Sequence, residues 1–339
     1  MDFEFWALLV LKLVLIASIV PGAALVAIYG ELKISAHMQS RIGPYFAGGR
    51  WGWAQPLADG LKFIQKEDLV PDEADDFVFR AAPYVVLAGT LATFVIIPAS
   101  PTLIVRDLDL GLFYLLAVSS VSTIGVLMAG WSSANKYSLM GGLRAAAQLI
   151  AYELPLVLAA VGVAIQAGTL SLGGIVAAQG EGGLYTIPGT DIGVPFVFAG
   201  QIVGFAIFMV ASLAELSRTP FDMPIAESEL VMGYLTEYSG LRFTMFFLGE
   251  YAGMVALSAI ASTLFLGGYY FPGLNENALE ILGPAILAAK VGLLVFLMIW
   301  MRWTFPRLRE DQLQSLAWRW LIPVSLANIV VTATLKVAI

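Results

Sequence analysis

Residues 145–166 read AAAQLIAYELPLVLAAVGVAIQ, an apolar run in which Glu153 is the single charged residue. About 20 such residues in a helix cross the roughly 30 Å hydrocarbon core of a bilayer. Comparable runs, bounded by charges or by Pro and Gly, lie at 5–29, 80–98, 111–130, 195–214, 243–266, 284–303 and 317–337. With 59% hydrophobic and 13% charged residues, the sequence predicts an all-α polytopic membrane protein with about eight transmembrane helices, and excludes a soluble enzyme.

The spans are interrupted by neither a tandem repeat nor a second soluble domain, so we expect one membrane domain over residues 1–339. The opening Met-Asp-Phe-Glu lacks the basic segment of a secretory signal, which predicts a retained first span. The net charge of -7 argues against nucleic acid as a partner. Because the chain has no Cys and one His, His37, we expect no metal site, no iron–sulfur cluster and no covalent cofactor here. Any redox centre should therefore lie in another chain.

The basic residues are distributed unevenly between the two sets of loops. Most of the 18 Lys and Arg residues belong to the loops after spans 1, 3, 5 and 7 or to their flanks: Lys33, Arg41, Arg50, Lys62, Lys66, Arg80, Lys136, Arg144, Arg218, Arg242, Arg302, Arg307, Arg309 and Arg319. Toward the other face lie Lys12, Arg106, Lys290 and Lys336. Since basic loops stay in the cytoplasm, we expect these loops to be cytoplasmic and both termini to lie outside.

The first cytoplasmic loop contains an amphipathic segment, QPLADGLKFIQKED at 55–68. Its apolar residues recur at helical spacing: Leu57, Leu61 and Ile64. Its charged residues fall on the opposite face: Asp59, Lys62 and Lys66. With Trp51 and Trp53 leading in, the pattern predicts a helix that lies in the plane of the membrane surface. An inert surface anchor would give the same pattern.

The loop after span 5 concentrates acidic residues against few basic ones. It contains Glu215, Asp222, Glu227, Glu229 and Glu237, with Arg218 as the only basic residue before Arg242. Mutual repulsion and burial both raise carboxyl pKa values, which suits proton exchange near neutral pH. The alternative is a solvated acidic loop. Interleaved apolar residues, together with two prolines at 220 and 224, favour an ordered, partly buried segment.

Two carboxyl groups lie inside predicted spans. Glu153 and Glu250 have apolar neighbours on both sides, and a carboxyl group at membrane depth is a candidate functional group. A hydrogen bond between packed helices is the structural alternative. Arg144 opens span 4 and could equally reach toward the membrane surface. The six acids of segment 67–76 are typical of a solvated connector or docking face, and His37 of an interfacial structural residue.

Several motifs together resemble one family, the quinone-site membrane subunit of respiratory complex I, the NADH-quinone oxidoreductase. They are QSRIGP at 39–44, QPLADGLKFIQKED at 55–68, GWSSANKYSLMGGLRAAAQLIAYE at 130–153, RTPFDMP at 218–224, ESELV at 227–231, and TEYSG at 236–240 followed by GEY at 249–251. The resemblance covers nearly the whole chain.

The resemblance implies a scaffold that frames a tunnel for the headgroup of a lipophilic quinone, in a prokaryotic plasma membrane. Electrons would come from an iron–sulfur subunit, and the partners would be soluble quinone-site and iron–sulfur subunits and small membrane subunits. It implies quinone contact by Glu31, Arg41, Asp59 and Lys62. It implies a charged path that couples quinone reduction to proton translocation through Arg144, Glu153, Glu215, Asp222, Glu227, Glu229, Glu237 and Glu250.

The chain departs from the family pattern at four positions. Leu32 stands where many relatives have Arg, Ile225 where they have Glu, Leu235 where His is usual, and Ser120 where some have Glu. The charged path is thus thinner than in those relatives. An equivalent subunit of a membrane-bound hydrogenase or cofactor-F420 dehydrogenase remains the alternative within the superfamily. An autonomous secondary transporter is a further alternative, although two matching halves with interrupted spans are not evident.

Overall fold

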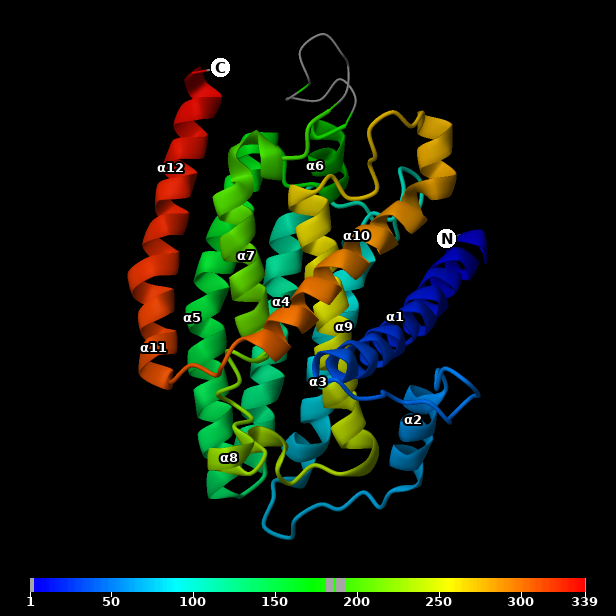
Figure 1. The fold of residues 1–339 in the computed structure, drawn as a ribbon, viewed down its shortest axis with the longest axis vertical. Coiled ribbons are helices and arrows are strands. Elements are labelled where there is room, and N and C mark those ends of the chain that lie inside the picture. Colours follow the sequence, from blue (N-terminus) through cyan, green and yellow to red (C-terminus); the bar gives the residue numbers. More distant parts are fainter. Residues whose placement is uncertain (1–2, 181–185, 187–192, 339) are drawn as a thin grey trace.

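The computed structural model describes residues 3–180, 186 and 193–338, which form helices joined by loops (Figure 1). The longer helices are α1 (Phe3–Met38), α3 (Asp76–Thr93), α4 (Gly111–Ser132), α5 (Lys136–Ala167), α7 (Ile202–Glu215), α9 (Gly240–Phe265), α10 (Glu276–Thr304) and α12 (Ile322–Ala338). The shorter ones are α2 (Gln55–Gln65), α6 (Leu172–Ala178), α8 (Glu227–Leu230) and α11 (Glu310–Ser315). Short 3-10 or π turns lie at Phe94–Ile96, Val197–Gln201, Gly233–Leu235 and Leu316–Leu321.

Eight helical segments within the described ranges are long and apolar enough to cross a membrane, each overlapping one predicted span. The prediction of an all-α polytopic membrane protein is confirmed. The main differences are at helix ends: the first span was expected to end at 29, but α1 continues to Met38, and α5 begins at Lys136 rather than at 145. Polar residues at these ends extend the helices beyond the apolar runs, so apolar periodicity alone underestimates their length.

The helices pack around a common apolar core. α3 packs against α4 and α9, α5 packs against α7 and α12, and α1 and α10 both contact α9. In Figure 1, α4, α5, α7 and α9 run along the long axis, whereas α1 and α10 cross obliquely in front of them. Small side chains in the core, including Ala159, Ala160, Ala211 and Ala252, are fully buried and allow close helix approach.

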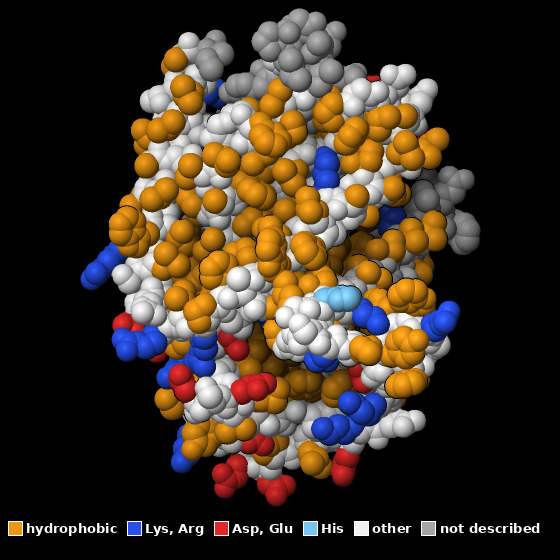
Figure 2. Space-filling model, in the orientation of Figure 1, with side chains coloured by type: hydrophobic (Ala, Val, Ile, Leu, Met, Phe, Trp, Pro, Cys, Tyr) orange, Lys and Arg blue, Asp and Glu red, His pale blue; other side chains and the backbone are white. Residues whose placement is uncertain are grey.

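One end of the bundle carries α2, α8 and the 215–240 loop, at the bottom of Figure 1. We call it the charged end, because Lys, Arg, Asp and Glu side chains gather over it in Figure 2, whereas the surface above is mostly hydrophobic. The opposite end is called the far end. A wide apolar band with charges on one side is the surface expected of a membrane-embedded bundle.

The segment that follows α7 is held against the bundle by hydrogen bonds to its backbone. Gln148 on α5 donates its side-chain amide to the carbonyl oxygens of Ala214 and Phe221, both at 2.8 Å. Because these two residues lie on either side of the turn after α7, one buried glutamine fixes where the 215–221 segment leaves the helix. The ordered loop predicted from its interleaved apolar residues is thereby explained.

Helix α2 is amphipathic, and its apolar face is directed outward. Leu61 and Ile64 are 61% and 60% exposed, while Phe63 packs against Phe243 of α9 with the rings tilted and their centroids 5.6 Å apart. α2 therefore contacts the bundle on one side and leaves an apolar face for lipid or another chain. Its in-plane orientation in a membrane stays a prediction.

Candidate functional site

The most buried charged side chain is Arg218, which follows the end of α7 and is 2% exposed. Its Nη1 atom donates to Oε2 of Glu31 at 2.7 Å, and its Nε atom lies 2.8 Å from Oε1 of Glu250. The guanidinium carbon lies 4.2 Å from the ring centroid of Tyr251. The cation thus joins α1, α9 and the acidic loop at the charged end. A buried charge is tolerated only with such pairing, because desolvation is costly.

Glu31 completes the cluster from the α1 side. It is 5% exposed and accepts hydrogen bonds from Arg218, from Nη1 of Arg302 at 2.6 Å and from the Tyr251 hydroxyl at 2.9 Å. We call these residues and Glu250 the Arg218 cluster. Two guanidinium groups and two carboxylates balance in charge, so a change in the protonation of one carboxyl group leaves a net charge in a poorly solvated place.

The pKa of Arg218 lies above its usual range. Burial alone would lower it, but the carboxylates of Glu250 and Glu31 raise it by more, so the guanidinium stays charged. Asp222 lies beside the cluster, and its Oδ1 atom is buried without a hydrogen-bond partner among the described residues. Burial raises the pKa of Asp222 to about 6, with Arg307 and Arg302 opposing the rise and Glu250 and Glu227 adding to it. Asp222 is therefore suited to exchange a proton near neutral pH.

A second charged group lies at the surface of the charged end. Glu229 on α8 pairs with Nη1 of Arg144 at 2.8 Å and with Nη2 of Arg307 at 3.2 Å. The Arg144 hydrogen bond and the Arg307 charge lower the pKa of Glu229. Arg144 also lies 3.8 Å from Glu310. These pairs tie α5, α8 and α11 together and keep Glu229 ionised.

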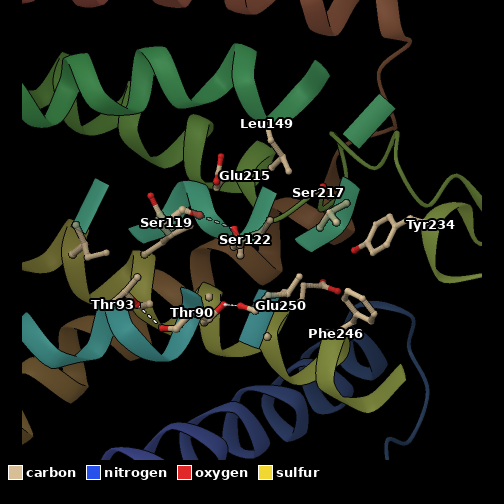
Figure 3. A pocket seen from close by; sticks show the side chains of 18 residues that line it. Thr90, Thr93, Ser119, Ser122, Leu149, Glu215, Ser217, Tyr234, Phe246 and Glu250 are labelled. Atoms are coloured by element: carbon tan, nitrogen blue, oxygen red, sulfur yellow. Dashed lines mark hydrogen bonds between the residues drawn. The ribbon is translucent and has the colours of Figure 1, made fainter. Parts of the chain in front are cut away.

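A cavity of about 110 Å³ lies inside the bundle next to the Arg218 cluster. Its walls come from α3, α4, α5, α7 and α9, with Glu215 and Glu250 among the lining residues (Figure 3). The Oε2 atom of Glu215 is buried, and the described residues offer it no hydrogen-bond partner. Glu250 belongs to both the cavity wall and the Arg218 cluster, so it links the two.

The sequence matches the NADH dehydrogenase family over residues 11–333. The chain belongs to this family. The H subunit of NADH-quinone oxidoreductase from Bacillus mycoides is 45% identical over 337 residues, covering 98% of this chain and 94% of the relative. The H subunits from Bacillus cytotoxicus and Bacillus cereus are each 44% identical, with the same shares covered. The resemblance drawn from the motifs is confirmed.

In this member of the NADH dehydrogenase family, the four residues expected at the quinone do not form one group. Glu31 is buried in the Arg218 cluster. Arg41 is exposed and donates to Gln39 at 2.6 Å, while on α2 the half-buried Asp59 and the exposed Lys62 pair with each other at 4.0 Å. Three of the four therefore lie on the surface of the charged end.

The eight residues expected in the charged path are divided among several places. Glu215 and Glu250 share the cavity, Arg144 and Glu229 form a surface pair, and Asp222 adjoins the Arg218 cluster. The remaining three belong to neither the cavity wall nor the ion pairs: Glu153, half-buried on α5 with its charge acting on Glu215; Glu227, exposed on α8 with its charge acting on Asp222; and Glu237, which accepts a hydrogen bond from Asn135.

Sequence reasoning assigned no role in the site to three residues that hold it together. Arg302 and Arg307 were counted only as basic residues near a loop, and Tyr251 was read only as part of a motif. Their contacts join positions far apart in the chain, such as Glu31 and Arg302. One feature of the sequence could have indicated the cluster. Arg218 is the single cation in an acidic segment, and a buried arginine needs carboxylate partners. Among the described residues, no group of three His, Asp or Glu could hold a metal ion.

Proposed function

We propose that this chain is the membrane subunit of a proton-pumping NADH-quinone oxidoreductase, where it forms the membrane part of the quinone chamber and relays the energy of quinone reduction. Its relatives are named as the H subunit of that enzyme. The observation that carries the proposal is the position of Glu250, paired with Arg218 at the charged end and lining the cavity inside the bundle. A charge change near the cluster reaches the cavity through this one side chain.

The quinone chamber is proposed at the charged end. Figure 2 shows a hollow with a largely hydrophobic floor below the end of α1, between α2 and the segment around α8, with charged side chains around it. An apolar floor suits a lipophilic quinone tail, and a polar rim suits its headgroup. The outward apolar face of α2 would lie against the lipid from which the quinone arrives.

The proposed relay uses the difference between fixed and titratable charges. Reduction of a quinone to a quinol takes up two electrons and two protons, and the electrons would come from the iron–sulfur subunit. Arg218 stays positive and Glu31 is fixed by three donors, whereas Asp222 has no hydrogen bond to Oδ1 and a pKa of about 6. Transfer of a proton from Asp222 toward the quinone would leave a negative charge beside the cluster, which acts electrostatically on Glu250 and, across the cavity that both line, on Glu215.

The remaining assignments follow from this proposal. The isolated chain would not catalyse electron transfer, and quinone is a substrate rather than a resident cofactor. The charged end would face the cytoplasm and contact the soluble subunits, with both termini on the other side of the plasma membrane. Small membrane subunits would cover part of the apolar band.

The test uses the assembled complex in membrane vesicles. We expect Glu250→Gln and Glu215→Gln each to lower proton pumping by about a hundredfold, because each removes an ionisable group from the relay. NADH-driven quinone reduction and vesicle acidification are measured together. Glu280→Gln is the matched control, since Glu280 is an exposed residue near the start of α10.

Two further variants address the surface acids. Glu229→Gln and Glu227→Gln should lower coupled turnover if the path includes α8. Wild-type pumping in both of these and in the two cavity variants would contradict the proposed function.

A further inference from the structure

We propose that Ser239 and Arg242, at the start of α9, are positioning residues for quinone entry, because they clamp the chain that follows α2 and so hold α2 at the edge of the proposed quinone chamber. We call residues 66–69 the strap, and Ser239, Gly240 and Arg242 the clamp. This inference rests on the proposed function, which puts α2 beside the quinone opening. The quinone contacts and the charged path expected from the family include neither Ser239 nor Arg242.

Helix α2 needs support from outside to keep its place. It has 11 residues, Gln55–Gln65, all within the described ranges, and of these only Pro56 is buried. A helix of this length is marginal in water by itself. Phe63 packs against Phe243 of α9, and Figure 1 shows the chain after α2 running below the start of that helix. The position of α2 therefore depends on how the segments at its ends are fixed.

A single hydroxyl group binds the strap twice. Ser239 donates its Oγ proton to the carbonyl oxygen of Glu67 at 3.0 Å and accepts from the backbone N–H of Leu69 at 3.2 Å. Ser239 occupies the N-cap position of α9, where a serine side chain usually accepts from the backbone of its own helix, yet it makes no such bond. The hydroxyl group therefore serves the strap rather than α9.

An ion pair in the first turn of α9 fixes the strap at a further point. Nη2 of Arg242 lies 3.2 Å from Oδ2 of Asp68, and the Arg242 side chain is 14% exposed. Its guanidinium carbon lies 5.7 Å from the ring centroid of Phe79 on α3. Because little water reaches this cation, loss of the carboxylate would leave a poorly solvated charge without its ion-pair partner. The solvent-accessible pair of Asp59 and Lys62 carries no such penalty.

The strap can approach α9 closely because residue 240 is a glycine. Gly240 has a φ of +56°, in the left-handed region that glycine adopts without strain. A Cβ atom there would lie 3.1 Å from the carbonyl oxygen of Lys66 and 3.6 Å from Cβ of Asp68. The turn that begins α9 thus leaves room for the strap.

The clamp continues the end of the acidic loop, which is itself fixed to other helices. Glu237 accepts a hydrogen bond from Asn135 between α4 and α5, and the Tyr238 hydroxyl donates to the carbonyl oxygen of Phe79 at 3.0 Å. Residues 237–242 therefore tie α2 to the same loop that carries Asp222. A quinone that passes α2 meets an opening whose position is set relative to the charged site.

The first experiment breaks the ion pair from each side in the assembled complex. Arg242→Gln and Asp68→Asn should each raise the KM for quinone about three- to tenfold and leave the maximal rate at saturating quinone unchanged, because α2 moves while the reaction chemistry stays in place. The double variant should resemble either single variant, since both remove the same contact. Additive effects would overturn the assignment of this pair.

Arg80→Gln is the matched control for the loss of an arginine at the charged end. Arg80 is exposed, pairs with Asp76 on its own helix and lies outside the clamp. We expect a wild-type KM from it.

Hydrogen exchange follows α2 without any turnover. In Arg242→Gln and in Ser239→Ala, the backbone amides of residues 55–65 should exchange about tenfold faster than in the wild-type complex, because α2 opens more easily. The amides of residues 246–260 should exchange as in the wild type, which verifies that α9 is folded and the complex assembled. Ser239→Ala suits this comparison, since α9 takes no cap bond from that side chain.

The outcomes separate this inference from the proposed relay. Unchanged exchange of residues 55–65 in both Arg242→Gln and Ser239→Ala would overturn the clamp. Faster exchange with an unchanged KM would also overturn the proposal, since α2 would then be held for a reason other than quinone entry. The relay is tested separately, by proton pumping in Glu215→Gln and Glu250→Gln.

Discussion

The two ends of the bundle use their positive charges differently. At the far end, Lys290 on α10 donates to the carbonyl oxygens of Leu266, Gly268 and Tyr270 at 2.7–2.8 Å. Lys336 donates to Gln166 at 2.9 Å, and Lys12 donates to Val105 at 2.8 Å. At the charged end, by contrast, Arg218, Arg302, Arg144 and Arg307 pair with carboxylates.

The lysine contacts at the far end hold the structure, whereas the arginine pairs at the charged end contain groups that can bind or release a proton. A backbone carbonyl does not titrate, so the acceptors of the far-end lysines carry no charge that a proton could change. A carboxylate can take up a proton, so an arginine–carboxylate pair is able to respond to chemistry beside it, as the proposed relay requires. The comparison also explains why three of the four basic residues outside the strongly basic loops are tolerated at the far end: each donates to carbonyl oxygens.

The largest effect is expected from breaking the Arg218 cluster. Arg218→Met leaves the carboxylates of Glu31 and Glu250 without their shared cation and should destabilise the chain by about 3–5 kcal/mol. Thermal denaturation of the purified complex measures the loss, and quinone reduction should be abolished. Adding Glu250→Gln should recover part of the stability but not the activity. Full activity in Arg218→Met would show that the buried charge is dispensable.

The far-end counterpart should lower stability with little effect on pumping. Lys290→Met removes a cation that serves three carbonyl oxygens, and the expected cost is about 1.5–3 kcal/mol. Lys336→Met, which removes a single such bond, is the matched control and should cost less. Melting temperature and pumping rate per assembled complex are compared in both. If the Lys290→Met complex melted like the wild type but pumped poorly, Lys290 would have a functional rather than a structural role.

The titratable character of the charged end can be tested at Asp222. Its pKa of about 6 lies above the ordinary 3.8, so the folded chain retains a proton that the unfolded chain has lost between these values. Stability is therefore lost as pH rises from about 4 to about 6, and the loss is complete above that. Asp222→Asn should raise stability by about 1 kcal/mol at pH 7, after allowance for partial solvent screening, and by nothing near pH 4.

The measurement is the difference in melting temperature between Asp222→Asn and the wild-type complex across pH 4–8. A difference that is constant over this range would mean that Asp222 does not titrate there. Taking the difference between the two proteins removes the contribution of all other groups, Glu215 included.

The spans could be predicted from the sequence because lipid imposes one requirement on each of them, an apolar length. The sequence predicts Glu250 in the half of its span nearer the acidic loop, and in the structure it lies ten residues after the start of α9 at Gly240. The partners of Glu31 could not be predicted, because Arg218 and Arg302 lie 187 and 271 residues away and depend on how α1 and α10 cross α9. The cavity was equally inaccessible, since it depends on which faces of α3, α4 and α9 meet.

Helix α2 lies at the charged end, but its ion pair is accessible to solvent, unlike the buried Arg218 cluster. Lys62 lies 4.0 Å from Asp59, and their side chains are 67% and 42% exposed. Such a pair contributes about 0–1 kcal/mol, so Asp59→Asn should leave the melting temperature of the complex unchanged. If α2 borders the quinone opening, the same variant raises the KM for quinone while the maximal rate at saturating quinone stays the same. Quinone titrations distinguish this from Arg218→Met, where saturation restores nothing, and an unchanged KM would remove Asp59 from the quinone path.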